Sequence, residues 1–380
     1  MSDKKKILYL TRYSLDEPFN LQNKFDGQLA AFSNLGFDVY FIGYDRNNLY
    51  LINGDKKIVY GKTHYAVPSY IHTQFYNDLH KAAIKAIEEI GFDYIYCRSA
   101  PLFESSCRVA EAAYDKGTKL LVEIPTFPSK KENNSKGIRK AFQIYSKRFD
   151  EKYNSMVTCY VVIGENANGE YRGKPAINIE NGIDINNVRI RTPHLKKDEV
   201  HILCVSAMRY WHGYDKLIKS LARYEGSKKV IIHLVGDLNG ECANEWKQLS
   251  KDLGFSDRVC FHGVLHGNDL DELVDKCDLG CASLRRQDYS HVSELKTREY
   301  TARGIPFIIA LQDNTFTDTE KVFWHQVSNN DEIPDMNDIV DFALNIRNDK
   351  SVIPFMRKFA EENLSWEKQY KSVFDEIERI

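Results

Sequence analysis

Residues 293–310 read Ser293-Glu294-Leu295-Lys296-Thr297-Arg298-Glu299-Tyr300-Thr301-Ala302-Arg303-Gly304-Ile305-Pro306, followed by the apolar run Phe307 to Ala310. The pattern predicts a helix with Ser293 as its N-cap and Gly304 at its end. Pro306 then leads the chain into a buried strand.

The start of such a helix is a site for an anion, because its backbone N–H groups are free and the positive end of the helix dipole lies there. Lys296 adds an ammonium in the first turn. Glu299 lies about one turn further along, where its carboxylate can reach hydroxyl groups attached to that anion. An ordinary surface helix with solvated charges has the same pattern, so both interpretations stay open.

Length and composition limit the class of protein. A chain of 380 residues exceeds the size of one growing core and predicts two domains. The net charge of −2 and the pI of about 6.6 argue against bulk nucleic-acid binding. No apolar run approaches the roughly 18 residues that span a bilayer, and Met1-Ser2-Asp3-Lys4-Lys5-Lys6 leads directly into a strand. A cytoplasmic protein is expected.

The eight cysteines are scattered along the chain and form no C-x-x-C pair. Several lie inside strand-like apolar runs, so we expect reduced core residues and no metal ligands. They are Cys97, Cys107, Cys159, Cys204, Cys242, Cys260, Cys277 and Cys281.

Short apolar runs alternate with longer amphipathic segments, which implies parallel, doubly wound sheets. The expected strands are residues 7–10, 39–42, 94–97, 120–122, 159–163 and 177–179, then 202–205, 230–235, 259–261, 279–282 and 307–309. The expected helices are residues 28–35, 78–90, 103–114, 137–153, 214–223, 243–253 and 270–276. A polar stretch after Asn181-Gly182-Ile183-Asp184, reaching Glu199, is expected to link two α/β domains that face each other across a cleft.

The second half carries a series of short motifs in a fixed order: Asn181-Gly182-Ile183-Asp184, Trp211-His212-Gly213-Tyr214-Asp215-Lys216-Leu217, Leu234-Val235-Gly236-Asp237, Phe261-His262-Gly263-Val264 and Glu299-Tyr300-Thr301-Ala302-Arg303-Gly304-Ile305-Pro306. This series resembles the C-terminal half of the retaining GT-B glycosyltransferases of family four, which include bacterial capsule and polysaccharide enzymes. The first half resembles the acceptor domain of that family more loosely, through the Asn20 to Gly27 loop and the segment 123–128.

The resemblance implies a GT-B fold with two Rossmann-like domains. An acceptor-binding domain is expected at 1–185 and a nucleotide-sugar-binding domain at 186–362. The segment 363–380, which begins near Ser365-Trp366-Glu367, is similar to the family's C-terminal helix that crosses back to the first domain.

Several site residues are implied by matching positions in the family. Glu299 matches the carboxylate that binds the ribose of the sugar donor. The backbone of Ser293, Glu294, Leu295 and Lys296 matches the segment around the donor diphosphate. Gly263 and Val264 lie where the family holds the nucleobase, and Gly236 opens the neighbouring turn.

Departures from the family pattern fall at the same site. His291 stands eight residues before Glu299, where the family has a glutamate, and we count it among the donor-binding candidates. The expected phosphate arginine falls on Ala207 and the expected lysine on His212. We therefore expect Arg209 and Lys296 to supply the missing positive charge as catalytic residues.

In the first domain Pro125 and Thr126 replace the residues that the family often has near the reacting carbon, which leaves Glu123 as the nearest ionisable group. Glu123 is a catalytic candidate, and a strand-end carboxylate bonded to local backbone is the alternative. Arg98 is expected either to bind the acceptor or a phosphate, or to pair with a carboxylate.

Transfer from a nucleoside-diphosphate sugar needs stabilisation of the leaving phosphate charge, which a helix start and cations provide. The resemblance therefore implies no metal and no cofactor. In a retaining front-face reaction the donor phosphate itself accepts the proton of the acceptor, so paired carboxylates are not required.

The segment 127–153 holds eight basic and three acidic residues, with Phe142, Ile144 and Tyr145 between them. Such a segment can lie on an anionic membrane and bring the enzyme to a lipid-linked acceptor. The alternative is a solvated helix that packs on its own sheet.

Three functions fit the sequence. The first is a retaining glycosyltransferase that extends a cell-surface glycan. The second is a catalytically weak GT-B subunit that stabilises an active partner, suggested by Ala207, His291 and Pro125. The third is a nucleotide-sugar epimerase of related architecture.

Overall fold

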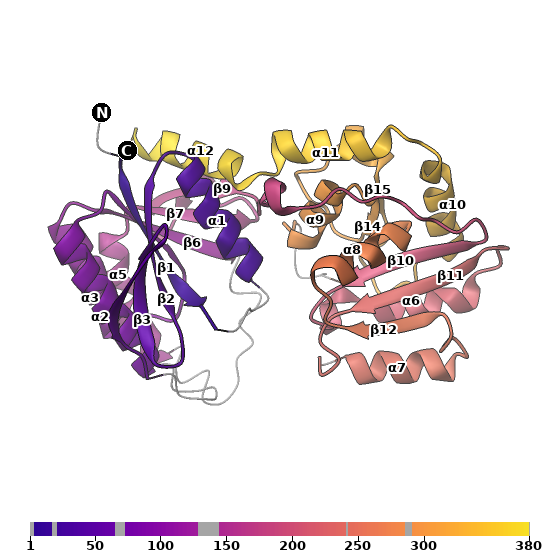
Figure 1. Ribbon diagram of the computed structural model, residues 1–380, viewed down its shortest axis with the longest axis horizontal. Coiled ribbons are helices and arrows are strands. Elements are labelled where there is room, and N and C mark those ends of the chain that lie inside the picture. Colours follow the sequence, from indigo (N-terminus) through magenta and orange to yellow (C-terminus); the bar gives the residue numbers. More distant parts are fainter. Residues whose placement is uncertain are drawn as a thin grey trace. The chain divides into compact units, whose positions relative to one another are not determined.

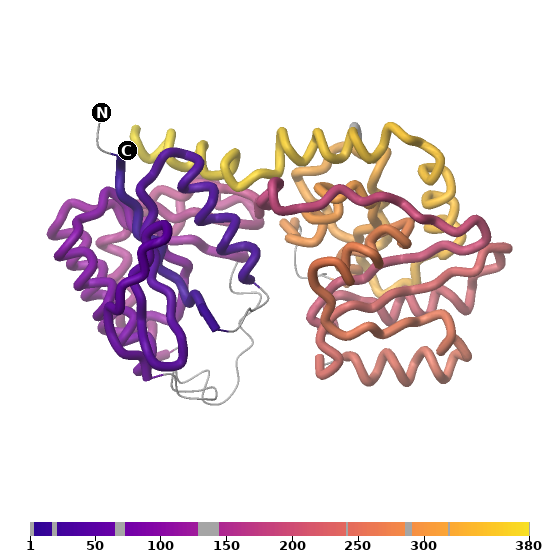
Figure 2. Tube along the Cα trace, viewed as in Figure 1, coloured from indigo at the N-terminus to yellow at the C-terminus, as the bar shows by residue number. Residues whose placement is uncertain are grey.

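The computed structural model describes residues 4–16, 21–64, 73–127, 144–240, 242–285 and 291–379, without the side chains of residues 318 and 319. The chain forms two compact units (Figures 1 and 2). Unit 1 comprises Met1–Asp184 together with Trp366–Ile380, and unit 2 comprises Ile185–Ser365.

Unit 1 is built on a nine-stranded sheet in the order β4-β3-β2-β1-β5-β6-β7-β9-β8. The strands from β2 through β1, β5, β6 and β7 to β9 run parallel. Their bounds are β1 Lys6–Ser14, β2 Asp38–Tyr44, β3 Asn48–Asn53, β4 Lys56–Lys62, β5 Tyr94–Arg98, β6 Lys119–Phe127, β7 Cys159–Gly164, β8 Glu170–Tyr171 and β9 Lys174–Ile179.

Both edges of this sheet differ from the fully parallel arrangement expected from the sequence. Strands β3 and β4 form an antiparallel hairpin next to β2, and β8 pairs antiparallel with β9. The hairpin turns at Gly54, whose φ of 54° is in the left-handed region that glycine adopts without strain. The dipeptide Asn53-Gly54 was the signal for this turn.

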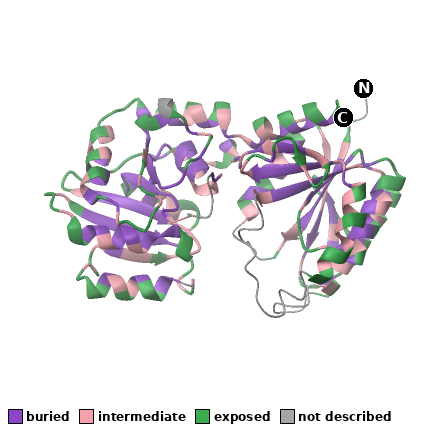
Figure 3. Ribbon diagram, turned by 180° about the vertical axis from the view of Figure 1, so that it is seen from behind, coloured by how far each residue is buried: buried purple, intermediate pink, exposed green. Residues whose placement is uncertain are grey.

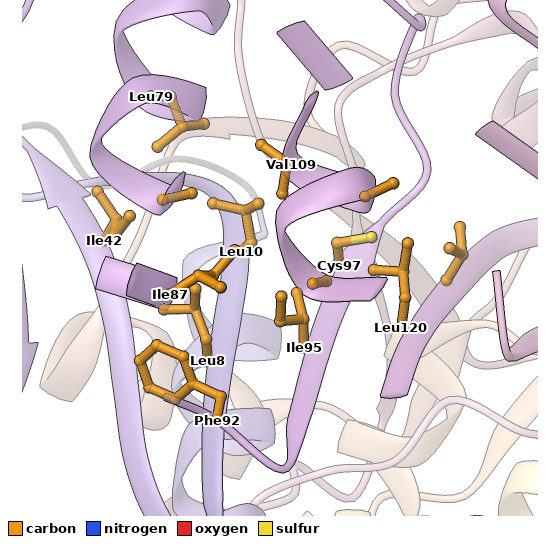
Figure 4. Packing of buried hydrophobic residues seen from close by; sticks show 14 of the residues in the cluster. Leu8, Leu10, Ile42, Leu79, Ile87, Phe92, Ile95, Cys97, Val109 and Leu120 are labelled. Carbon is orange, nitrogen blue, oxygen red and sulfur yellow. The ribbon is translucent and has the colours of Figure 1, made fainter. Parts of the chain in front are cut away.

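Helices cover both faces of the unit 1 sheet. Leu8 and Leu10 point from β1 toward α2 and α3, in the core that Figure 4 shows. On the other face Tyr9 contacts Phe32 of α1, and Tyr370 of α12 lies 4.6 Å from the same ring. Alternate residues of β1 therefore enter two different cores. The helix bounds are α1 Gln22–Asn34, α2 Thr73–Ile90, α3 Glu104–Asp115, α5 Asp150–Met156 and α12 Trp366–Ile377.

Trp366, the first residue of α12, packs so closely on unit 1 that two neighbouring positions have room only for glycine. A Cβ at Gly182 would lie 2.7 Å from the Trp366 ring, and a Cβ at Gly27 would lie 2.8 Å from it. The indole is almost completely buried, at 1% exposure. Glycine at both positions lets the C-terminal helix pack on unit 1.

Unit 2 is built on a six-stranded, fully parallel sheet in the order β12-β11-β10-β13-β14-β15. Buried residues fill its four central strands, and the helices around it are buried on one side only (Figure 3). The strand bounds are β10 Glu199–Val205, β11 Lys229–Val235, β12 Val259–Gly263, β13 Leu279–Cys281, β14 Phe307–Ile309 and β15 Trp324–Gln326. The helix bounds are α6 Tyr214–Ser220, α7 Ala243–Asp252, α8 Gly267–Lys276, α9 Leu295–Arg303, α10 Met336–Arg347 and α11 Val352–Asn363.

The expected linker through Glu199 is wrong beyond Asp184, because this segment packs on unit 2. Arg191 is buried and its Nη1 donates to the carbonyl oxygen of Cys277 at 2.7 Å. The backbone N–H of Thr192 donates to Asp275 Oδ1 at 2.7 Å. Polar side chains held by such bonds look like a linker in sequence but are ordered parts of a domain.

Among the described helices, none combines the length and hydropathy that membrane crossing requires.

Candidate functional site

The candidate site in unit 2 lies where parallel strands end. Ser206 follows β10, Gly236 follows β11 and Ser283 comes two residues after β13. In open parallel sheets ligands bind at these carboxyl ends. Helix α9, which follows β13 and precedes β14 in the chain, lies in the same unit (Figure 1).

Gly236 allows three strand ends to approach one another. Its φ is 150°, and a Cβ there would lie only 1.7 Å from the carbonyl oxygen of Ser206. Its N–H donates to the carbonyl oxygen of Gly263 at 2.8 Å. Any side chain at this position would push the loop after β10 away from β11.

Helix α9 begins one residue later than the sequence predicted. Its N-cap is Glu294 rather than Ser293, and within the described part of the chain the Glu294 side chain makes no capping bond. The carboxylate binds Ser283 instead of the helix start, because the N–H and Oγ of Ser283 donate to Glu294 Oε2 at 3.2 and 3.0 Å. The predicted end is confirmed, because Gly304 is the C-cap with a φ of 78°.

Lys296 lies in the first turn of α9 and gathers residues from two other elements. Its Nζ is 3.0 Å from Nδ1 of His212, 3.4 Å from Oγ of Ser283 and 3.5 Å from Oε2 of Glu294. The Lys296 side chain is only 14% exposed. A cation held at a helix start, close to three strand ends, favours the binding of an anion there.

One member of this cluster, Ser283, was found only in the structure. The residue pattern gave Ser283 no role, although its place just after the strand 279–281 was a usable signal. Glu294 was expected to contribute backbone, yet its carboxylate is part of the cluster. Glu294 Oε1 is buried and has no hydrogen-bond partner among the described residues. A buried carboxylate oxygen without a partner is suited to accept a hydrogen bond from a hydroxyl group of a ligand.

Glu299 is oriented by a neighbouring arginine. Arg303 Nε donates to Glu299 Oε1 at 2.9 Å, and Arg303 Nη1 lies 2.5 Å from Asp271 Oδ1. The Glu299 side chain stays 35% exposed, so Oε2 remains within reach of a ligand. The residue is thus held in place and still accessible, as a ribose-binding carboxylate needs to be.

Arg209 is exposed on the loop between β10 and the short 3₁₀ helix Tyr210–His212. The residue before it, Met208, is buried and has a φ of 49°, which is unusual for a residue other than glycine. The Met208 N–H donates to Ser206 Oγ at 3.0 Å and thereby holds this conformation. The loop that carries Arg209 therefore has a defined and strained shape.

The remaining predicted donor-binding residues lie nearby in unit 2. His291 is 5% exposed, and its Nδ1 accepts from the backbone N–H of Asn314 at 3.1 Å, a bond that ties two loops together. Gly263 has a φ of 75°, and Val264 beside it is 57% exposed. Leu295 is half-buried in the first turn of α9.

Glu123 of unit 1 is the centre of a buried polar network. Its carboxylate accepts from Lys24 Nζ at 3.0 Å, Gln28 Nε2 at 2.7 Å and Tyr96 Oη at 2.9 Å, and Arg98 Nη1 lies 3.5 Å away. Burial raises the pKa of Glu123, but Lys24 and Arg98 outweigh it and the pKa is lowered. With 1% exposure and side-chain partners, Glu123 fits a structural role better than the catalytic role or the local backbone bonding expected from the sequence.

A cavity of about 1160 Å³ opens at the carboxyl ends of the unit 1 strands. Its lining includes Arg12 and Arg98 from strand ends, with Lys147 and Arg172 from later loops. Aromatic and apolar side chains such as Tyr76 form much of the rest. Arg98 Nη1 makes no hydrogen bond among the described residues. The cavity lining therefore combines arginine and lysine side chains with apolar ones, and Arg172 is paired there with Asp150 at 2.9 Å.

The basic segment expected to contact a membrane falls largely outside the described residues. Of residues 127–153, only Phe127 and residues 144–153 are described. Tyr145 is 42% exposed there and Ile144 is 57% exposed.

Residues 187–315 match the family model of glycosyl transferases group 1. This segment contains the Lys296 cluster and Glu299. A search of the curated proteins gives no significant match.

Solved structures resemble the whole chain. A glycosyltransferase from Rickettsia africae ESF-5 is 16% identical with a TM-score of 0.66, over 99% of each chain. HepE of Anabaena in complex with UDP and glucose is 16% identical with a TM-score of 0.60, over 99% of this chain and 100% of that chain. Sucrose-phosphate synthase from Thermosynechococcus elongatus is 12% identical with a TM-score of 0.65, over 99% of each chain. The chain thus has the GT-B fold, and its second unit carries a segment that matches the glycosyl transferases group 1.

Proposed function

We propose that this protein is a retaining glycosyltransferase of family four. It moves a sugar, a hexose in the first instance, from a nucleoside-diphosphate sugar to a glycan or lipid-linked acceptor, and it acts in the synthesis of a cell-surface polysaccharide. The observation that carries the proposal is the cluster of Lys296, His212, Ser283 and Glu294 at the start of α9, inside the matched segment.

In this proposal the first turn of α9 and Lys296 bind the donor diphosphate. Negative charge develops on the diphosphate as the bond to the sugar lengthens, and an ammonium beside free backbone N–H groups stabilises that charge without a metal. Arg209, on the exposed loop before His212, adds a second cation to the leaving group.

Two carboxylates position the rest of the donor. Glu299, held by Arg303, accepts hydrogen bonds from the ribose hydroxyls. Glu294 Oε1, which has no hydrogen-bond partner among the described residues, accepts a hydrogen bond from a hydroxyl of the sugar. Gly236, Gly263 and Val264 surround the base, and His291 holds the loop that precedes α9 through its bond to Asn314.

The acceptor binds at the unit 1 cavity, where Arg98 and the aromatic lining offer both a cation and apolar surface. Its hydroxyl attacks the sugar on the face that the diphosphate leaves, and its proton passes to a phosphate oxygen of the leaving group. This step needs no protein base, which agrees with the burial of Glu123.

A donor screen tests the proposal. The purified chain is mixed with nucleotide sugars and its unfolding temperature is measured, because a bound donor stabilises in proportion to its affinity. UDP-sugars come first, since HepE of Anabaena was solved with UDP-glucose. Product stereochemistry by NMR then tests retention. Turnover of a nucleotide sugar to its epimer without acceptor would favour the epimerase, and binding without turnover would favour the partner subunit.

A cytoplasmic site at the inner face of the cell membrane completes the proposal, because lipid-linked acceptors lie there. The segment 127–153, with its excess of basic residues, provides the contact with anionic lipid. Co-sedimentation with vesicles that contain or lack anionic lipid tests this point. Equal sedimentation with both vesicles would contradict it.

A further inference from the structure

Strands β10, β11 and β12 are neighbours in the unit 2 sheet (Figure 1), and each carries one histidine of a line of three imidazoles. His201 Nδ1 lies 2.8 Å from His233 Nε2, and His233 Nδ1 lies 2.9 Å from His262 Nε2. These side chains point away from the core that Ile202 and Ile232 help to fill on the other face. The line plays no part in the proposed transfer.

Cys260, on β12, lies close to two of these imidazoles, those of His233 and His262. It is paired with His233 across β11 and β12 and lies two residues before His262. One ligand atom each from His233, Cys260 and His262 lies within 4.8 Å of the other two. Cys260 is half-buried and His262 is exposed, so an ion can reach the cluster from solvent.

We propose that His233, Cys260 and His262 form a site for a transition-metal ion of the zinc class. Zn²⁺ takes nitrogen at about 2.0–2.1 Å and thiolate sulfur at about 2.3 Å, which places tetrahedral ligand atoms about 3.3 to 3.6 Å apart. The nitrogens of His233 and His262, at 2.9 Å, need to separate by only a few tenths of an ångström. Water supplies the fourth ligand.

A carboxylate fixes which nitrogen of His233 faces the ion. Glu199 Oε2 lies 2.8 Å from His201 Nε2 and can only accept, so His201 donates from Nε2. When His201 carries this one ring proton, its Nδ1 accepts from the Nε2–H of His233. This leaves the lone pair of His233 Nδ1 directed toward His262 and Cys260. A histidine ligand whose second nitrogen is held by an outer partner is the usual arrangement around protein-bound metals.

Metal binding needs both imidazoles as neutral rings and the Cys260 sulfur as a thiolate. As the metal–sulfur bond forms, the thiol proton passes to solvent, and one proton is released for each ion bound.

Cobalt provides the direct test, because Co²⁺ replaces Zn²⁺ and is coloured. The purified full-length chain is stripped with a chelator and titrated with Co²⁺ alone. We expect one ion per chain, a thiolate-to-cobalt charge-transfer band in the near ultraviolet and the visible bands of tetrahedral Co²⁺. Loss of these bands on adding Zn²⁺ gives the zinc affinity. Octahedral Co²⁺ without the thiolate band would overturn the proposal without any variant.

Matched variants locate the site. Cys260→Ser and His262→Ala should each weaken Zn²⁺ binding by more than tenfold, and Cys260→Ser should also abolish the thiolate band. Glu199→Gln changes the partner of His201 and leaves all three ligands in place, so it should weaken binding less than either ligand variant does. His194→Ala, an exposed histidine elsewhere in unit 2, is the control. Equal zinc affinity in wild type, Cys260→Ser and His262→Ala would contradict the assignment.

Discussion

Lys296 Nζ lies 3.0 Å from His212 Nδ1, although Lys296 belongs to α9 and His212 to the loop after β10. An ammonium can only donate, so the imidazole accepts at Nδ1 and carries its proton on Nε2. His212 stands where the resemblance implies a lysine. Its neutral ring instead orients Lys296, a lysine of α9. The positive charge is kept at the site, although a different segment of the chain supplies it.

Replacing that charge should abolish most of the activity. Lys296→Met keeps the length of the side chain and removes the ammonium, so kcat/KM for transfer should fall about 100-fold or more, the scale measured for the loss of one charge-stabilising donor. Lys358→Met is the matched control, because Lys358 is 73% exposed on α11. An unchanged kcat/KM in Lys296→Met would remove Lys296 from the mechanism.

Glu299→Gln should lower affinity for the ribose of the donor. The wild-type chain should bind a ribonucleoside diphosphate about tenfold more tightly than its 2′,3′-dideoxy counterpart, which corresponds to about 1.4 kcal/mol. The variant should bind both with similar affinity, measured by calorimetry. Glu361→Gln, an exposed residue of α11 whose partner Arg357 also lies four residues away, should leave the preference intact. A preference that persists in Glu299→Gln would contradict the ribose assignment.

Glu123→Gln should reduce stability more than catalysis. The substitution leaves Lys24 buried beside a neutral group, and such unpaired charges cost about 3–5 kcal/mol of unfolding free energy. Urea unfolding measures this loss. Glu104→Gln, exposed on α3, should change stability by less than about 0.5 kcal/mol. If Glu123→Gln kept full stability and lost activity, Glu123 would be catalytic after all.

Stability should fall as the pH drops below 6.5, with His80 as one cause. Burial lowers the pKa of His80 from 6.5 to about 4, so the folded chain stays neutral where the unfolded chain binds a proton. Its contribution is complete above pH 6.5, falls by about 3 kcal/mol between pH 6.5 and 4, and is constant below. Between pH 4 and 6.5, His80→Gln should reduce the slope of the unfolding free energy against pH by the equivalent of about one bound proton. His266→Gln, at an exposed histidine, is the control and should keep the wild-type slope. Identical slopes would show that His80 is not involved.

Arg98 should affect the acceptor and leave the donor unaffected. Arg98→Gln removes a cation from the lining of the unit 1 cavity, so KM for an anionic acceptor should rise about tenfold with little change in the thermal shift caused by the donor. Arg108→Gln on the exposed face of α3 is the control. A change in donor affinity alone would place Arg98 outside the acceptor site.

Most of the parallel strands were predictable because they are short apolar runs with most residues buried, whereas β15, which pairs parallel with β14, was not predicted. Strand 230–235 illustrates the predictable kind, since all six of its residues are buried and none needs a distant partner to be recognised. The hairpin of β3 and β4 was missed despite its Asn53-Gly54 signal, because edge strands expose one side and carry charged residues such as Lys56 and Lys57.

The site was predictable only in part, for a physical reason. Glu299 and Gly304 belong to a local pattern of helix and cap, which the sequence states directly. Ser283 and Glu294 come together only when the end of β13 meets the start of α9, and that contact also moved the N-cap from Ser293 to Glu294. Burial of Glu123 depends on Lys24, 99 positions earlier in the chain, so no local pattern could reveal it.

The most direct test of the account is consumption of a nucleotide sugar by the wild-type chain and by Lys296→Met. Each donor is incubated with protein and a panel of glycan and lipid-linked acceptors, and release of nucleoside diphosphate is measured. The account predicts that at least one donor raises the unfolding temperature of both proteins and is consumed about 100-fold faster by wild type. If no nucleotide sugar stabilises or is consumed by the wild-type chain, the account is contradicted.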